Sequence, residues 1–212
     1  MIDFNLLHEK LLCQSKPIKV LHREIKINGV IKMARPHMDF FFFFCKTIIS
    51  QQISEKAAES IWKKFCESNT VSMWDESYNQ TTRTIKYFKT LSNLNKKIKK
   101  IGISSQKSSY ITSMYKRIKN NEFNINKLTK KKETMIREEL LKFNGIGNWT
   151  CDMILIFFLS KLDILPLGDL IIKKTCKKIC ELEKKEINFS EIFKPYQTVL
   201  SLHLWKMAKR VL

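Results

Sequence analysis

The stretch FNGIGNWTCDMILIFFLSKLDILPLGDLIIKK, residues 143–174, decides the fold of this chain. It holds three of the five glycines in the 212 residues, and two of them frame the turn Gly145-Ile146-Gly147. Glycine has no Cβ, so this turn can adopt positive φ and let a foreign backbone come close. Its exposed amides, followed by the N-terminus of a helix, are suited to binding a phosphate group.

Hydrophobic periodicity on both sides of the turn predicts short helices. An amphipathic helix is predicted over residues 134–143 and ends at the turn. A second, apolar helix is predicted from about Thr150 to Leu159. A loop with Pro166 and Gly168 follows, and Asp169 opens a third helix whose outer face is rich in lysine. This is a helix-hairpin-helix pattern. The alternative is an ordinary helix that ends at a glycine.

Helical periodicity continues through most of the chain, and the low Gly and Pro content supports an all-α protein. The run of five phenylalanines at 40–44 is expected to be buried on a helix, and a bend at Ser50–Ser54 separates it from the next helix. Further helices are expected over 74–94, after a cap at Ser104-Ser105, and over 196–212.

The charge of the chain indicates a polyanionic partner. Lys and Arg number 39 against 20 Asp and Glu, a formal net charge of +19, and the basic clusters are spread along the chain. A folded basic face that releases counterions from phosphates explains this distribution. The alternative is a genome rich in AT codons, in which case most lysines are only solvated surface. A ribosomal or RNA-binding protein would explain the charge but not the hairpin followed by Asp169.

The six cysteines include no CxxC pair, which argues against a zinc knuckle and favours reduced thiols in a cytosolic protein. Charged residues near the N-terminus predict no secretion signal, and the longest apolar runs are too short to span a membrane. We therefore expect a cytoplasmic protein, associated with the nucleoid if the source is bacterial, and no membrane partner.

Four blocks of the chain, in order, resemble the helix-hairpin-helix (HhH-GPD) DNA glycosylase superfamily, and most closely its 3-methyladenine DNA glycosylase II branch. They are IISQQISEKAAESIW at 48–62, KKIGISSQKSSYI at 99–111, the hairpin stretch with its downstream Asp, and KPYQTVLSLHLW at 194–205. The resemblance implies a two-lobed helical fold, with residues 37–212 as the glycosylase core and the helix-hairpin-helix at about 134–159.

The chain departs from this branch in two places. Gln197-Thr198 stands where the family has Arg-Ser, which puts in doubt any salt bridge of that Arg. The N-terminal β domain of many bacterial members is expected to be absent or reduced, because about 36 residues precede the first block. Residues 1–36 are interpreted as an N-terminal packing segment, in which Gly29 offers a hairpin turn.

The resemblance assigns Asp169 as the catalytic carboxylate. Cleavage of an N-glycosidic bond builds positive charge on the sugar. The active site therefore requires at least a negative charge beneath the sugar and a pocket for the extruded base. Asp169 could stabilise this cation or orient a water molecule. The alternative is that Asp169 only caps the helix that it opens.

The same resemblance places Trp149, Trp205 and Met153 around the base, although plain core packing is the alternative for Trp205. A purine alkylated at N3 or N7 is cationic, stacks on indole and leaves without a general acid. In strand-cutting relatives a lysine nucleophile occupies the position that is Trp149 here. A monofunctional hydrolase is therefore expected, acting on purines of the 3-methyladenine and 7-methylguanine type.

Duplex DNA with a damaged base is the expected partner of a monomeric protein. Gln52 matches the position that fills the hole left by the flipped base, and a buried, helix-bending Gln51-Gln52 pair is the alternative. The residues expected to contact DNA are Gly145, Ile146, Gly147, Thr150, Gln51, Gln52, Lys173 and Lys174. No cofactor is required, and a structural Na⁺ or K⁺ could be held by the main-chain carbonyls of Leu141, Phe143 and Ile146.

Two rival functions remain open from the sequence. One is a glycosylase of the same superfamily that removes a different base, such as uracil, hypoxanthine or an oxidised purine. The other is a non-enzymatic helix-hairpin-helix module that only clamps DNA. Such a module needs the glycine turn but neither Asp169 nor an aromatic slot.

Overall fold

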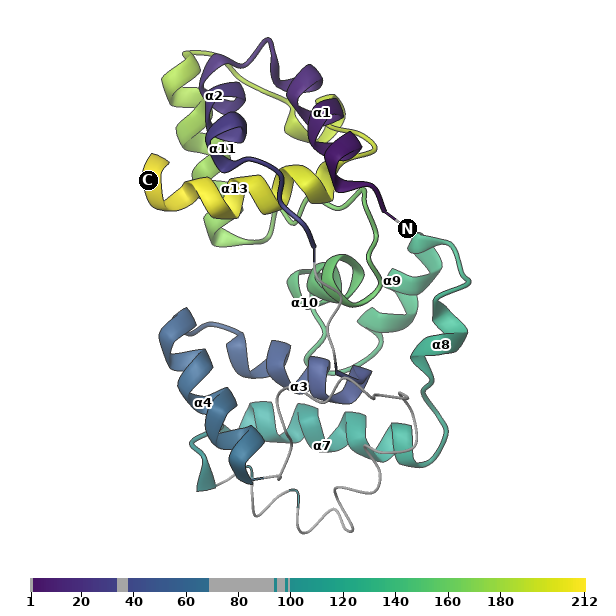
Figure 1. The fold of residues 1–212 in the computed structure, drawn as a ribbon. Coiled ribbons are helices and arrows are strands. Elements are labelled where there is room, and N and C mark those ends of the chain that lie inside the picture. Colours follow the sequence, from purple (N-terminus) through teal and green to yellow (C-terminus); the bar gives the residue numbers. More distant parts are fainter. Residues whose placement is uncertain (1, 34–37, 69–93, 95–97, 99) are drawn as a thin grey trace. The chain divides into compact units, whose positions relative to one another are not determined.

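The computed structural model describes residues 2–33, 38–68, 94, 98 and 100–212, and the regular elements of these residues are helices (Figure 1). The prediction of an all-α fold is confirmed. The chain divides into two compact units, one formed by Met1–Ala34 with Leu155–Leu212 and the other by Arg35–Ile154. The helix predicted over 74–94 falls outside the described residues, apart from Leu94.

The first unit is built by helices from the two ends of the chain. α13 (Gln197–Val211) packs against α11 (Leu170–Glu183), α2 (Lys19–Asn28) and α1 (Phe4–Ser15), as Figure 1 shows for the purple and the yellow-green segments. The short α12 (Phe189–Ile192) completes the unit. Its buried core draws on all of these helices and includes Leu11, Leu21, Ile25, Ile172, Ile179, Phe189, Phe193 and Leu204.

The prediction of a hairpin turn at Gly29 is wrong. Gly29 has φ of 64° and follows the last residue of α2, where its amide donates to the carbonyls of Ile25 and Lys26. A glycine with positive φ satisfies the carbonyls that the end of a helix leaves unpaired, so the same residue type serves a helix end as readily as a hairpin.

A buried polar cluster lies where α2 meets α13. His203 is fully buried, its ring stacks on that of His8 at 5.5 Å, and its Nδ1 accepts an N–H from the Asn28 amide at 3.1 Å. An Nδ1 that accepts a hydrogen bond belongs to a neutral imidazole. Burial, together with the charges of His8 and Lys206, lowers the pKa of His203 to about 3.

This cluster predicts a loss of stability in mild acid. A group whose pKa falls on folding stabilises the protein above its unfolded pKa of about 6.5, and this stability is lost as the pH falls toward the folded value. We expect the free energy of unfolding to fall by about 2 kcal/mol between pH 7 and pH 5 because of His203. Urea unfolding at both pH values checks this. His203→Gln should remove most of the pH dependence, and His22→Gln on α2 should retain it; equal pH dependence in wild type and His203→Gln would contradict the assignment.

The second unit surrounds the run of phenylalanines. All five rings, Phe40 to Phe44, are buried on α3 (Phe40–Ser50), as predicted, and Asp39 caps the helix. α3 packs against α4 (Glu55–Ser68) and α7 (Ser105–Lys119), whose N-cap is Ser104. Further helices of this unit, among the described residues, include α8 (Ile125–Leu128), α9 (Glu133–Leu141) and α10 (Asn148–Met153).

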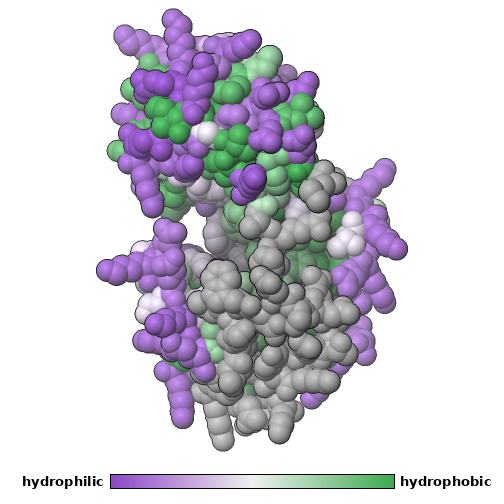
Figure 2. All heavy atoms as spheres, in the orientation of Figure 1, coloured by the Kyte–Doolittle hydropathy of each residue, from purple (hydrophilic) through white to green (hydrophobic). Residues whose placement is uncertain are grey.

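Hydrophilic residues cover much of the surface that Figure 2 shows for the described residues. Lysines predominate among the exposed charges, in keeping with the net charge of +19. In the described part of the chain, each helix is too short or too polar to cross a bilayer.

Candidate active site

The glycine turn joins α9 to α10, as the sequence predicts, although α10 begins at Asn148, two residues before the expected start. Gly145 has φ of 91°, and a Cβ built on it would lie 2.5 Å from the ring of Tyr110. Gly147 differs, because its φ of −90° is ordinary and no atom lies within 4 Å of a built Cβ. Gly145 is therefore required by the fold, whereas Gly147 leaves open space at the N-terminus of α10.

An ion pair that the sequence analysis missed ties the two helices of the hairpin together. Arg137 on α9 donates to the Asp152 carboxylate on α10 at 2.7 Å, and the Asp152 side chain is 9% exposed. Burial raises the pKa of Asp152, and the hydrogen bond from Arg137 opposes this effect. Removing one partner would leave the charge of the other uncompensated, so the pair stabilises the contact between α9 and α10.

The predicted site residues of α10 differ in exposure. Trp149 is half-buried, while Thr150 and Met153 are buried. The Thr150 hydroxyl accepts an N–H from the Gln51 side chain at 2.8 Å, so it braces the turn from the inside; its contact with DNA stays a prediction. The expected helix up to Leu159 changes character after Met153, where a π-helical segment, η1 (Ile154–Phe158), begins.

The two glutamines of the α3–α4 bend have different environments. The Gln51 side chain turns inward and donates to the carbonyl of Gly145 at 2.9 Å, in addition to Thr150. Gln52 is exposed and has φ of 57°, a conformation that a residue with a Cβ rarely adopts. The interpretation as a buried pair therefore fits Gln51 alone, and Gln52 is presented to solvent as its predicted insertion into DNA requires.

Asp169 lies at the start of α11 in the first unit, and its carboxylate both caps this helix and accepts an indole N–H. Its Oδ1 accepts the amides of Ile171 and Ile172 at 2.9 and 3.0 Å, which makes it the N-cap. The same oxygen accepts the indole N–H of Trp205 at 3.2 Å. Three donors and the N-terminus of a helix thus stabilise one negative charge.

Trp205 is half-buried at the edge of the core, where its ring stacks on Phe157 at 5.7 Å. One side of the indole therefore packs as a core residue while its N–H faces the carboxylate. Lys173 and Lys174 are exposed on α11, about one turn beyond Asp169. The structure brings Trp205 to Asp169. Trp149 and Met153 belong to the other unit, and their part in the same pocket stays a prediction.

Comparison with known families decides the affiliation of the chain. Residues 45–197 match the family described as HhH-GPD superfamily base excision DNA repair protein. The chain belongs to this superfamily. Among similar curated proteins, the alkylbase DNA glycosidase-like protein mag2 of Schizosaccharomyces pombe is 28% identical over 170 residues, covering 77% of this chain and 76% of that protein. The DNA-3-methyladenine glycosylase of Saccharomyces cerevisiae is 29% identical over 204 residues, covering 80% and 67%.

Solved structures agree with the HhH-GPD assignment at the level of fold. The 3-methyladenine DNA glycosylase Mag1 of S. pombe, in complex with abasic DNA, superposes with a TM-score of 0.68 at 23% identity, covering 88% of this chain and 90% of that one. The 3-methyladenine DNA glycosylase of Archaeoglobus fulgidus gives a TM-score of 0.74 at 22% identity, covering 95% and 69%.

The structure shows which contacts Gln197 and Thr198 make at the position where the chain departs from the HhH-GPD pattern. Gln197 donates to the carboxylate of Asp163 at 2.8 Å, so a neutral amide takes up the contact that an Arg could make as a salt bridge. The fully buried Thr198 donates to the carbonyl of Lys161 and accepts the amide of Ile164. Both side chains hold the loop that leads to Asp169.

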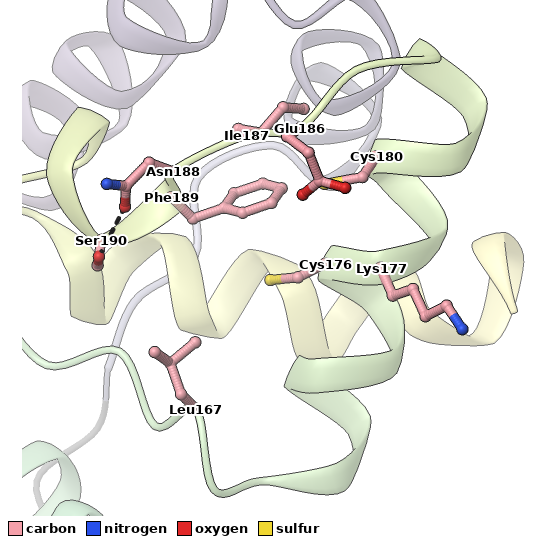
Figure 3. Close-up of a pocket in the computed structure, with 9 residues that line it drawn as sticks. All are labelled: Leu167, Cys176, Lys177, Cys180, Glu186, Ile187, Asn188, Phe189 and Ser190. Carbon is pink, nitrogen blue, oxygen red and sulfur yellow. Dashed lines mark hydrogen bonds between the residues drawn. The ribbon is translucent and has the colours of Figure 1, made fainter.

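A pocket of about 320 Å³ lies beside α11 in the first unit (Figure 3). None of the predicted site residues lines it; its walls include Leu167, Cys176, Lys177, Ile187 and Phe189. Burial raises the pKa of the Cys176 thiol to about 12, so this sulfur is neither a ready nucleophile nor a ready metal ligand. Among the described residues, His, Cys, Asp and Glu side chains form no group of three that could hold a metal ion.

Proposed function

We propose that this HhH-GPD protein is a monofunctional DNA glycosylase that hydrolyses the N-glycosidic bond of alkylated purines, of the 3-methyladenine and 7-methylguanine type, in base excision repair. The observation that carries the proposal is the Asp169 carboxylate, fixed at the start of α11 by two amides and the Trp205 indole. A non-enzymatic DNA clamp has no need of a carboxylate held in this way.

The chemistry needs one well-placed negative charge. As the base departs, the sugar becomes an oxocarbenium-like cation, which a fixed carboxylate stabilises without reorganisation of its surroundings. Asp169 could also orient the water that attacks the sugar. An alkylated purine is already cationic, so it leaves without protonation, and few polar groups around the base are required.

The monofunctional assignment rests on Trp149. A lyase reaction requires an amine that attacks the sugar to form a Schiff base, and the indole of Trp149 cannot do so. Lys173 and Lys174 are exposed and are better suited to phosphate contact. The expected product is therefore an intact strand with an abasic site.

In this proposal, residues of the second unit bind the DNA. The amides of Gly145, Ile146 and Gly147 would hold a phosphate, since the open space at Gly147 lets a backbone approach. Gln52, exposed on its turn, would fill the hole left by the flipped base. We expect the protein to act on duplex DNA as a monomer.

We also propose that the hairpin holds a monovalent cation. α9 ends at Leu141, and carbonyls in the last turn of a helix have no partner within it. The Phe143 carbonyl accepts the Ile146 amide at 3.0 Å, and a carbonyl oxygen has a second lone pair. These two carbonyls and that of Ile146 would hold Na⁺ or K⁺, which would brace the turn and take no part in bond cleavage.

Incubation with methylated duplex DNA, followed by identification of the free bases, tests the proposed function. Release of 3-methyladenine and 7-methylguanine, with the strand intact, is expected. A panel of duplexes with single uracil, hypoxanthine or oxidised purine lesions separates the rival glycosylases. Binding without the release of any base would instead support a DNA clamp.

Trp205→Phe tests the contact between the indole and the carboxylate. This change keeps an aromatic ring but removes the N–H that Asp169 accepts. We expect single-turnover base release to slow by about ten-fold, the size of one hydrogen bond to a charged group. Trp205→Ala, which also removes the ring, should lose more. A wild-type rate in Trp205→Phe together with a slow Trp205→Ala would assign stacking alone to this residue.

A further inference from the structure

Lys107 on α7 makes contacts that the proposed function has not used. Its side chain is half-buried, and its ammonium donates to the carbonyls of Ile49 and Gln51 at 2.8 and 2.7 Å. These carbonyls lie at the C-terminal end of α3, where a helix leaves its carbonyls unpaired and favours a positive charge. Burial lowers the pKa of Lys107, as expected for an ammonium withdrawn from water.

The same turn is tied to the glycine hairpin. The Gln51 side chain donates to the Gly145 carbonyl at 2.9 Å and to the Thr150 hydroxyl at 2.8 Å. Tyr110 lies one helical turn beyond Lys107 and packs its ring against Gly145. One face of α7 therefore contacts the α3–α4 bend through Lys107 and the hairpin through Tyr110, and Gln51 bridges the two.

These contacts bear directly on Gln52. The carbonyl of Gln51 belongs to the peptide bond that precedes Gln52, and Gln52 has a left-handed φ of 57°. A residue other than glycine keeps this conformation only where its surroundings impose it. In this turn, the hydrogen bond from Lys107 fixes the peptide on one side of Gln52.

We propose that Lys107 is a positioning residue for base flipping, which holds the Gln51–Gln52 turn at a fixed place relative to the hairpin. The inference rests on the proposed function and deepens it. With the hairpin holding a phosphate, a fixed turn directs Gln52 into the duplex at a set distance along the strand. Lys107 itself, with its ammonium turned toward two carbonyls of the protein, acts through Gln52 and not by contact with the sugar.

The experiment compares one lesion in two settings. Single-turnover release of 7-methylguanine is measured in duplexes that place it opposite cytosine or opposite a tetrahydrofuran abasic analogue. An unpaired base costs less to flip, so it depends less on a well-placed wedge. Lys107→Met is expected to slow release from the paired lesion by about ten- to a hundred-fold, because the Gln52 side chain would no longer be correctly positioned. Release from the unpaired lesion should slow by less than about three-fold.

Lys116→Met is the matched control, because Lys116 is exposed on the same helix and loses the same charge. It should leave both rates within about two-fold of wild type. Lys107→Arg, which keeps the charge and N–H donors, should restore most of the rate on the paired lesion. Since both rates come from one preparation, a partly unfolded sample does not alter their ratio. If Lys107→Met yields no folded protein, Lys107→Gln carries the same comparison.

Equal slowing of both lesions by Lys107→Met would overturn the positioning role and leave only a contribution to folding. A second readout does not depend on catalysis: the fluorescence of 2-aminopurine placed next to a 7-methylguanine that is paired with cytosine, followed before any base is released, should rise less with Lys107→Met than with wild type. If wild type released no 7-methylguanine but still raised this fluorescence more than Lys107→Met did, the proposed function would fail and the positioning role would stand.

Discussion

Replacing Asp169 by Asn should slow the release of alkylated bases by about a thousand-fold or more, as expected when a fixed charge opposite a developing cation is neutralised. Asn caps helices as well as Asp does, so the amides of Ile171 and Ile172 keep an acceptor. The fold of α11 and the affinity for undamaged duplex should therefore change little. The substitution separates capping, which survives it, from catalysis, which does not.

Single-turnover release of 3-methyladenine from methylated duplex measures this effect, with binding measured on unmodified duplex. Asp163→Asn is the matched control, because Asp163 lies in the loop before Asp169 and its partner Gln197 can donate equally well to an amide oxygen. It should retain nearly the full rate. Near-normal release by Asp169→Asn would show that the carboxylate is only a cap, and the proposed mechanism would be wrong.

Replacing Gly145 by Ala should destabilise the second unit by about 2–5 kcal/mol, the combined cost of a left-handed alanine and an overpacked contact. The new Cβ would meet the ring of Tyr110 at 2.5 Å, and the φ of 91° suits only glycine. The turn can relieve the clash only by moving away from α7. Binding to duplex DNA should therefore be lost together with stability.

Gly147→Ala provides the contrast, since its φ is ordinary and the space around it is open. Its stability should stay within about 0.5 kcal/mol of wild type, while its affinity for DNA falls because the methyl group stands where a phosphate would approach. Urea unfolding and a DNA-binding titration measure both quantities. Wild-type stability of Gly145→Ala would refute the packing argument, and wild-type affinity of Gly147→Ala would refute the phosphate grip.

The sequence predicts local features of this protein well. Helical periodicity and the glycine turn predict α9 and α10, and the residue types at 168–170 predict that Asp169 opens α11. These features depend on neighbours within a few residues. The predicted start of α10, at Thr150, lies two residues too late because Asn148 and Trp149 carry no strong helix signal of their own.

The long-range contacts that stabilise the site cannot be predicted from the sequence. Lys107 reaches Gln51, Gln51 reaches Gly145, and Gln197 reaches Asp163, in each case across tens of residues. A polar side chain on a helix has the same local pattern whether it faces solvent or a distant carbonyl. Only tertiary packing decides between them. The block at 99–111 that resembles the family includes Lys107, but its local pattern does not show which carbonyls its ammonium contacts.

If Asp169 is the catalytic carboxylate, as proposed, its orientation depends on the first turn of α11. The carboxylate is oriented by the amides of Ile171 and Ile172, which are available to it only while α11 is wound from its first residue. Fraying of that turn would remove two of the three hydrogen bonds described for Oδ1 and leave the Trp205 indole as its remaining donor among them. In the proposed mechanism, local unfolding of this helix start would therefore lower the rate of bond cleavage without unfolding the rest of the unit.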